Sequence, residues 1–451
     1  MKAGIKTDYP AVPAGVSYSI RLLITLDAEV AVKRDSPQLN IGLVLDRSGS
    51  MAGEKLRRVK EAATEIITNI KGDDYISLTA FDSQVDVIFE PIRGSDAGRE
   101  IIARVEQIDD RGCTFLWGGY KKGYELVKKH RNEKNISRII LLTDGLANEG
   151  ITDPEILTAK AAKFAEKNII TTTIGVGEDF DEKLLGMMAK AGKGNTYYIE
   201  TPAEAAEVFS DELGSLMSVA ATETVIRFIP SVKGVKAGQF NNFNEAGKGA
   251  WFVGDVYSGR QRTIMLELGI PAQEKLSEFK AGELQVTFMV PGEEHSGLKE
   301  LKLPVILNIV SEKEFEEIKP DREVTRMLFA FIIAETKRKV LDLMESGDYK
   351  KAAALIAELI AKLKKFDHPD EGLIIEIGEL EERKMMMEAY RERYYDADKK
   401  RLHYESSYVE EGKMYSGKAM YSRREKSHFN PLDQLKSIKK TITGKNKKQG
   451  N

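Results

Sequence analysis

The chain has 451 residues, more than one ordinary domain holds, so we expect two or three domains. Hydrophobic residues make up 42% and charged residues 31%, which is typical of a soluble globular protein, and a formal net charge of −3 excludes a general attraction to nucleic acid. The single cysteine excludes an intramolecular disulfide and suits a reducing compartment. We find neither an apolar secretion signal at the amino terminus nor an apolar run long enough to span a bilayer, and we therefore expect a cytoplasmic protein.

Residues 1–37 are predicted to supply the first strand or strands of a β-sandwich. Within them, residues 16–33 alternate imperfectly between apolar and polar side chains, with Ile20, Leu22 and Ile24 at every second position. This strand has no partner nearby, so we expect it to pair with strands that come much later in the chain.

Residues 38–218 alternate regularly between strand and helix patterns. This order predicts a doubly wound, mostly parallel six-stranded sheet with helices on both faces. One helix has a clear start at Asp153-Pro154, because Asp is a favoured N-cap and Pro a favoured first helical residue. We expect strands at 40–46, 75–82, 85–90, 137–143, 169–175 and 196–199, and helices near 53–70, 95–108, 117–130, 153–167, 180–190 and 202–217.

Residues 219–320 lose the helix pattern and predict the remainder of an antiparallel β-sandwich. Turns that carry Gly or Pro separate the strand-like segments. The α/β domain would then be inserted within the β-sandwich, which domains tolerate because their termini often lie close together. The expected strands are 222–230, 249–257, 262–270, 283–291 and 301–310.

The rest of the chain is predicted to be helical and then irregular. Residues 321–408 carry helical patterns, including two helices that flank Gly347-Asp348. Residues 409–451 are rich in Lys and Arg and lack apolar periodicity, which predicts a basic, largely disordered tail. Such a tail can favour acidic partners, nucleic acid or membrane surfaces, but it is more often only solvated.

Polar side chains follow two of the buried strands and one loop of the predicted α/β domain. Asp46, Ser48 and Ser50 come directly after the strand at 40–46, and Asp144 follows the strand at 137–143. Thr114 lies in a Gly-containing loop before a helix. The carboxyl ends of parallel strands meet at one edge of a sheet, where open α/β sheets bind ligands, so we expect these five side chains to converge.

The five side chains offer only oxygen, which favours Mg²⁺, Mn²⁺ or Ca²⁺ and argues against zinc. Two carboxylates neutralise a divalent ion but leave its coordination incomplete. Mg²⁺ prefers octahedral geometry and retains bound waters, so we expect one position to face solvent. A carboxylate from another molecule could fill such a position. The sequence therefore predicts a metal-bridged binding site.

This arrangement resembles the von Willebrand factor type A domain and its metal-ion-dependent adhesion site. The family pattern is Asp-x-Ser-x-Ser, then a loop Thr, then an Asp after a later strand. The whole chain resembles the bacterial stand-alone proteins of this family. The resemblance implies that Asp46, Ser48, Ser50, Thr114 and Asp144 hold the ion, and that an acidic residue of a protein partner completes its shell. One departure is Gly112-Cys113-Thr114, where the family usually has Gly-Gly-Thr.

Other interpretations of the same residues stay open. Asp and Ser are ordinary turn and N-cap residues, so the chain could be a metal-independent scaffold. Family resemblance alone suggests an adaptor subunit for a ring-forming ATPase. A metal-assisted hydrolase is disfavoured, because no histidine or further carboxylate adjoins the predicted site as a general base, and we expect no enzyme activity.

Overall fold

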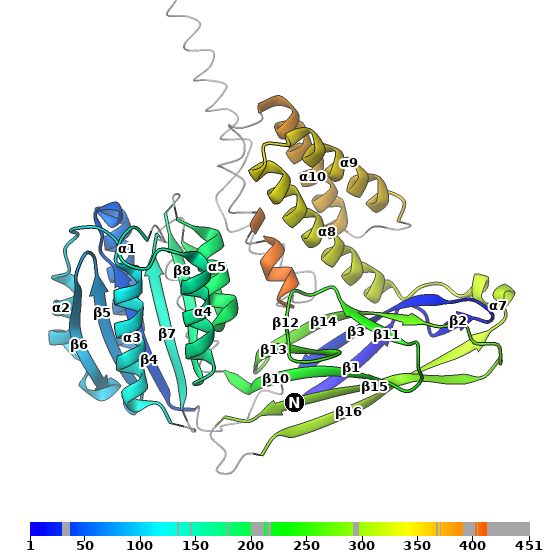
Figure 1. Ribbon diagram of the computed structural model, residues 1–451, viewed down its shortest axis with the longest axis horizontal. Coiled ribbons are helices and arrows are strands. Elements are labelled where there is room, and N and C mark those ends of the chain that lie inside the picture. The colour runs from blue at the N-terminus through cyan, green and yellow to red at the C-terminus, as the bar shows by residue number, and fades with distance from the viewer. Residues whose placement is uncertain are drawn as a thin grey trace, which may run out of the picture.

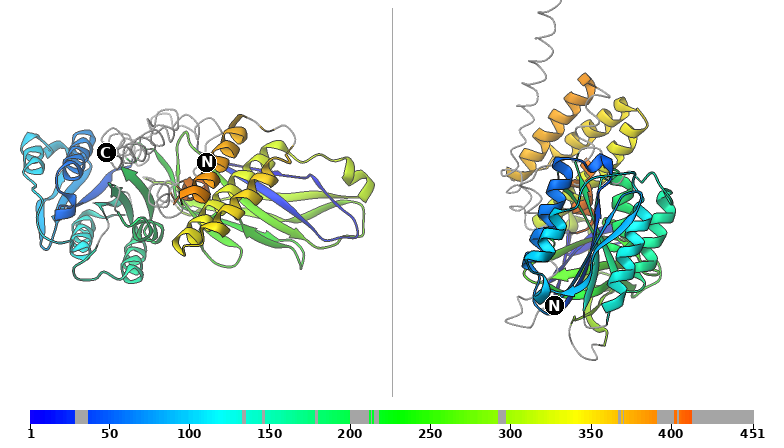
Figure 2. Two further views of the ribbon diagram at one scale, coloured as in Figure 1. Left: turned by 90° about the horizontal axis from the view of Figure 1, so that it is seen from above. Right: turned by 90° about the vertical axis from the view of Figure 1, so that its left-hand side faces the viewer.

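The protein has an α/β unit at one end, two β-sheets at the other, and a group of helices beside them (Figure 1). The views of Figure 2 show the α/β unit and the β-sheets end to end, with the helices standing on one side. The computed structural model describes residues 1–28, 37–132, 135–144, 147–177, 180–199, 212, 214, 218–291, 297–366, 369, 371–390, 402–403 and 405–412.

The α/β unit contains a six-stranded sheet in the order β6-β5-β4-β7-β8-β9. All neighbouring strands pair in parallel except β5 and β6, which are antiparallel. This confirms the predicted mostly parallel sheet. The strands are β4 (Leu39–Asp46), β5 (Tyr75–Phe81), β6 (Val85–Arg93), β7 (Ile136–Thr143), β8 (Ile169–Val176) and β9 (Lys193–Ile199).

Helices cover both faces of this sheet. The apolar faces of α1 and α2 pack on one side and those of α3, α4 and α5 on the other. Asp153 caps α4 by accepting hydrogen bonds from the N–H groups of Glu155 and Ile156, as predicted. The helix expected near 202–217 lies outside the described residues except for positions 212 and 214. The helices are α1 (Glu54–Asn69), α2 (Arg99–Glu106), α3 (Leu116–His130), α4 (Pro154–Ala165) and α5 (Glu182–Ala191).

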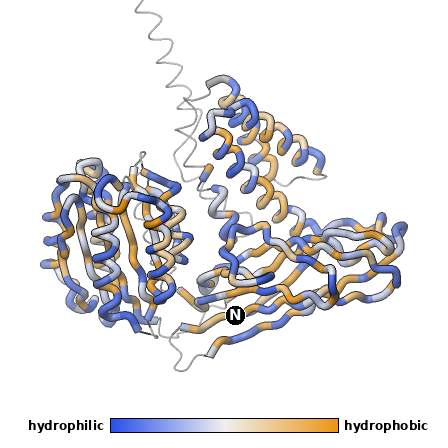
Figure 3. The backbone as a smooth tube through the Cα atoms, viewed as in Figure 1, coloured by the Kyte–Doolittle hydropathy of each residue, from blue (hydrophilic) through white to orange (hydrophobic). Residues whose placement is uncertain are grey.

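The two remaining sheets face each other around a second apolar core. Their strand orders are β1-β3-β14-β11 and β12-β13-β10-β15-β16-β2. Hydropathy alternates along these strands, whereas the central strands of the α/β unit are more uniformly hydrophobic (Figure 3). The strands are β1 (Lys2–Thr7), β2 (Ala11–Pro13), β3 (Tyr18–Asp27), β10 (Val219–Pro230), β11 (Lys236–Gln239), β12 (Asn244–Glu245), β13 (Ala250–Tyr257), β14 (Gln261–Ile270), β15 (Glu278–Met289) and β16 (Lys299–Val310).

Four of these strands were not predicted from the sequence: β1, β2, β11 and β12. They are short, and β1 carries lysines and a glycine in place of a regular apolar pattern. The sandwich also departs from a purely antiparallel one, because β2 pairs in parallel with β16.

The α/β unit is inserted into the sandwich. β3 pairs with β14 across residues 18–27 and 261–270, so strands from before and after the α/β unit share one sheet. The chain leaves the sandwich at Ala28, which bridges to Ser258, and returns at Val219, which pairs with Tyr257. The exit and the return are therefore neighbours in space.

Helices follow the last strand, as predicted. A short helix α7 (Glu312–Glu317) precedes α8 (Arg322–Glu345), α9 (Tyr349–Leu363) and α10 (Glu371–Tyr390), and Gly347-Asp348 separates α8 from α9. Val324 and Phe331 of α8 pack against Leu23 and Met265 of the sandwich. Among the described helices, none has the length and apolar character needed to cross a membrane. The tail predicted at 409–451 begins too early, because residues 405–410 are helical and Val409 packs against Phe331 of α8 and Met265 of the sandwich. The remainder of that tail, from residue 413 onward, lies outside the described residues.

Candidate functional site

Asp46 ends β4 and is fully buried at the carboxyl edge of the sheet. Its Oδ1 accepts a hydrogen bond from the N–H of Ser48 at 2.8 Å, and its Oδ2 accepts one from the Thr143 hydroxyl at 2.5 Å. Thr143 is the last residue of β7, so this bond joins the ends of two neighbouring strands. Asp46 is therefore held rigidly with one donor on each oxygen.

The two serine hydroxyls that follow Asp46 converge. A 3₁₀ turn over Gly49–Met51 folds the chain back before α1 begins, and the Ser48 and Ser50 hydroxyl oxygens lie 3.1 Å apart. Ser48 is buried and Ser50 is exposed. The pair thus reaches from the buried carboxylate toward solvent.

Thr114 lies on a neighbouring loop that is tied to the serine turn. The N–H of Gly49 donates to the carbonyl of Gly112 at 3.1 Å, and the N–H of Thr114 donates to the Asn148 side-chain oxygen at 2.7 Å. Gly112 has φ +68°, and a Cβ there would lie 2.9 Å from the Ser83 hydroxyl, so this position requires glycine. Thr114 is buried, and the loop before α3 was predicted correctly.

Asp144 follows β7 and has no exposed surface. Within the described part of the chain, its Oδ1 is buried without a hydrogen-bond partner. Its Oδ2 lies 3.5 Å from the Lys55 ammonium nitrogen. A buried carboxylate oxygen without a hydrogen-bond partner is energetically costly, so Asp144 Oδ1 is the atom of the site best suited to bind a cation.

The electrostatics of the site favour a cation. Burial, with a smaller contribution from the nearby Asp144 charge, raises the pKa of Asp46 to about 6 against the opposing hydrogen bonds from Thr143 and Ser48. Two buried carboxylates so close together repel each other. A divalent ion between them would relieve that repulsion.

The five predicted residues therefore occupy three loops joined by hydrogen bonds at one edge of the sheet, and their oxygens fit a hard cation. Among the described residues there is no group of three or more His, Cys, Asp or Glu side chains that could hold a metal. That result is consistent with a set in which hydroxyls supply most of the donors. The structure adds Thr143, Asn148 and Lys55 as supporting residues that the sequence did not single out.

Comparisons with known proteins identify the fold of the α/β unit. Residues 40–211 match the sequence profile of the von Willebrand factor type A domain. A solved structure described as von Willebrand factor type A from Catenulispora acidiphila superposes with a TM-score of 0.68 at 18% identity, covering 92% of this chain and 97% of that one. Residues 40–211 form a von Willebrand factor type A (VWA) domain.

Two bacterial relatives extend the similarity beyond the VWA domain. The uncharacterized protein sll0103 of Synechocystis sp. is 27% identical over 351 residues, covering 72% of this chain and 80% of its own length. The uncharacterized protein YfbK of Escherichia coli is 27% identical over 271 residues, covering 56% of this chain. The chain spans about half, 46%, of the length of the latter. VWA domains are modules of protein–protein interaction and generally not enzymes.

Arg47 and Arg111, which lie in the loops of the VWA site, form ion pairs with the same two carboxylates. Both guanidinium groups donate to Asp82 Oδ2 at 2.7 Å, and both also pair with Asp86. Although burial opposes it, hydrogen bonds from Arg111 and Arg47 hold the pKa of Asp82 below its ordinary value. The arginine between Asp46 and Ser48 is thus paired with Asp82 and Asp86.

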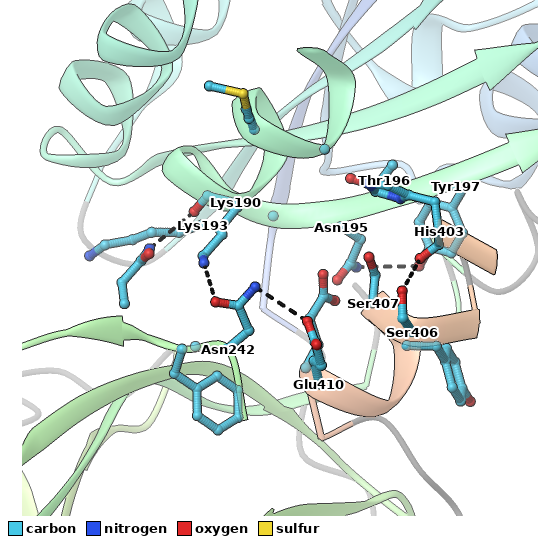
Figure 4. A pocket seen from close by; sticks show the side chains of 18 of the residues that line it. Lys190, Lys193, Asn195, Thr196, Tyr197, Asn242, His403, Ser406, Ser407 and Glu410 are labelled. Carbon is cyan, nitrogen blue, oxygen red and sulfur yellow. Dashed lines mark hydrogen bonds between the residues drawn. The ribbon is translucent and has the colours of Figure 1, made fainter. Parts of the chain in front are cut away.

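A second concave region lies where the VWA domain meets the sandwich and the terminal helical segment. This cavity has a volume of about 670 Å³ and is shown in Figure 4. Lys190 of α5 donates to the Asn242 side chain at 2.7 Å, and Asn242 donates to Glu410 at 3.3 Å. Glu410 also accepts from Arg338 of α8 at 3.1 Å. These contacts join all three parts of the molecule.

The contact between the VWA domain and the sandwich, which we call the seam, also contains a buried ion-pair network around Arg138 of β7. Its guanidinium donates to Glu212 at 2.9 Å and to Asp255 of the sandwich at 2.8 Å. Despite burial, Arg138 and hydrogen bonds that include those from Thr172 and Asn195 hold the pKa of Glu212 below its ordinary value. Burial raises the pKa of Asp255 more than its pairing with Arg138 lowers it. The network fixes the VWA domain to the sandwich.

Proposed function

We propose that this protein is a divalent-cation-dependent interaction module. Asp46, Ser48, Ser50, Thr114 and Asp144 would hold Mg²⁺, or Mn²⁺ or Ca²⁺, and an Asp or Glu of a protein partner would bind the open position of the ion. The observation that carries this proposal is the buried, unpartnered Oδ1 of Asp144 beside the Asp46 loop.

The donor set supports a hard cation in this role. Hydroxyl and carboxylate oxygens suit Mg²⁺, which prefers octahedral coordination and retains positions for water. Ser50 is exposed while Ser48 and Thr114 are buried, so the set opens toward solvent on one side. A bound ion there would supply the charge that attracts an acidic side chain of a partner.

Binding is a better proposal than catalysis for this site. A metal-assisted hydrolase needs a general base near the ion-activated water. Asp46 has both oxygens engaged by Ser48 and Thr143, and Asp144 has Lys55 beside it.

The exposed single cysteine, Cys113, is consistent with a reducing compartment and supports the predicted cytoplasmic location.

The test is affinity capture with the purified full chain in Mg²⁺ or in chelator, followed by mass spectrometry. We expect proteins that bind in Mg²⁺ and are lost in chelator and with Asp144→Ala. Mg²⁺ affinity measured by calorimetry should fall in the same variant by more than the ~10–100-fold that loss of an outer-shell partner costs.

The matched control is Asp73→Ala, an exposed carboxylate outside the site in the turn before β5. It should leave capture and Mg²⁺ affinity unchanged. Proteins captured equally by wild type, by Asp144→Ala and in chelator would instead favour a metal-independent scaffold.

A further inference from the structure

Lys55 stands at an unfavourable place for a lysine. It is the second residue of α1, and the positive end of a helix dipole disfavours a cation in the first turn. Its side chain nevertheless turns toward the oxygen site, where the ammonium nitrogen lies 3.5 Å from Asp144 Oδ2. The attraction of Asp144 therefore explains why a lysine occupies the first turn of this helix.

The aliphatic part of the Lys55 side chain packs against Gly177, the residue that follows β8. A Cβ at Gly177 would lie 2.4 Å from Lys55 Cε and 3.3 Å from its Nζ. Gly177 has φ +83°, a conformation that glycine adopts at no steric cost. The missing side chain at position 177 is what lets the lysine lie against the site.

Lys55 reaches from the partly exposed surface to the buried Asp144. The Lys55 side chain is 22% exposed, whereas that of Asp144 is 0% exposed. Two other cations near the site in sequence, Arg47 and Arg111, are paired with Asp82 and Asp86. The ammonium of Lys55 therefore supplies positive charge beside Asp144 where a divalent ion would otherwise supply it.

We infer that Lys55 is a tethered counter-ion that competes with the divalent cation for Asp144. Without metal, the ammonium neutralises Asp144. When the ion binds, charge repulsion displaces the ammonium and opens the site to an acidic partner. This inference rests on the proposed function and adds a regulatory step to it: ion binding and lysine release are one exchange.

The first test measures Mn²⁺ affinity of the purified full chain by calorimetry. Lys55→Met should bind Mn²⁺ about tenfold more tightly than wild type, because no cation has to be displaced. Lys55→Arg keeps the charge and should bind no more tightly than wild type. Lys71→Met, an exposed lysine just past the far end of α1, removes the same charge elsewhere and should change the affinity less than twofold.

The second test needs no metal. In chelator, Lys55→Met should lower the thermal unfolding midpoint in the wild-type background but not in an Asp144→Asn background, because the lysine has lost its partner there. Equal effects in both backgrounds would overturn the counter-ion role.

The outcomes separate this inference from the proposed function. Normal Mn²⁺ binding by wild type with no tightening in a folded Lys55→Met variant overturns the exchange alone. Tightening without any metal-dependent capture of a partner supports the exchange and overturns the proposed function. If neither wild type nor Lys55→Met binds Mn²⁺, both are wrong.

Discussion

The VWA site and the seam both bury carboxylates, but Glu212 of the seam and Asp144 of the site differ in how their oxygens are paired. In the seam, Glu212 has both oxygens satisfied, one by Arg138 and Thr172 and the other by Asn195 and Tyr197. At the VWA site, Asp144 keeps one oxygen without a partner in the described part of the chain.

The pKa values of Glu212 and Asp46 shift in opposite directions. The pKa of Glu212 lies below its ordinary value although the residue is fully buried, whereas burial raises that of Asp46 to about 6. Glu212 is provided with four donors, one of them an arginine. The pKa of Asp255, the other seam carboxylate, is raised by burial as that of Asp46 is, so burial by itself does not tell structural acids from binding acids.

Replacing Arg138 is the most direct test of the structural role of the seam. Arg138→Met leaves Glu212 and Asp255 buried without their cation, so we expect a loss of about 3–5 kcal/mol in the free energy of unfolding. Urea unfolding followed by circular dichroism measures it. Arg104→Met, which removes an exposed arginine paired only with exposed Glu100, should stay within about 0.5 kcal/mol of wild type. A similarly small effect at Arg138 would show that the network is not a structural one.

Metal should stabilise the VWA site and leave the seam unaffected. At a free Mg²⁺ concentration of 100 times the dissociation constant, we expect the free energy of unfolding to rise by about 2.7 kcal/mol, because the ion binds only the folded site. Adding chelator should reverse the rise, and Asp144→Asn should abolish it. A Mg²⁺ effect that persists in Asp144→Asn would place the ion elsewhere.

The loop that holds Thr114 should be sensitive to backbone strain. Gly112→Ala puts a side chain at φ +68° and against Ser83, so we expect a loss of about 1–2 kcal/mol together with weaker Mg²⁺ binding. Gly269→Ala in β14 is the control, since nothing lies within 4 Å of a Cβ there and its φ is outside the left-handed region. Thermal unfolding and calorimetry report the two effects, and unchanged Mg²⁺ binding in Gly112→Ala would separate this loop from the site.

The smallest expected effect, that of Asp144→Asn on stability, compares the VWA site with the seam most directly. In chelator, Asp144→Asn should leave the protein as stable as wild type or up to about 1 kcal/mol more stable, because it removes a buried charge that is incompletely paired. The matching change in the seam, Glu212→Gln, weakens a satisfied ion pair with Arg138 and should destabilise. Denaturant unfolding of both variants decides the point, and a loss in Asp144→Asn as large as in Glu212→Gln would contradict it.

Patterns within one segment could be predicted from the sequence. Strands β4 and β7 were predicted because most of their residues are apolar, and the Asp46 loop was found because its polar residues come directly after such a run. The N-cap at Asp153 was equally local.

Features that depend on distant segments could not be predicted. Strand β1 is held by its pairing with β3 and carries too weak a pattern to be recognised alone. Lys55 reaches Asp144 across 89 positions, and nothing in its neighbours indicates that contact. Arg138 did give a signal: a charged residue beside a buried apolar run in a central strand needs a buried partner. Its partners, Glu212 and Asp255, lie 74 and 117 positions away and only the fold identifies them.

The placement of the VWA domain inside the sandwich has a consequence for biosynthesis. β3 leaves the ribosome long before β14, its neighbour in the finished sheet, because the whole α/β unit is translated between them. At roughly 5–20 residues per second, the early strands would wait for tens of seconds with an open edge. The nascent chain therefore completes its inner domain before its outer one, and the outer one can close only after translation has passed residue 310.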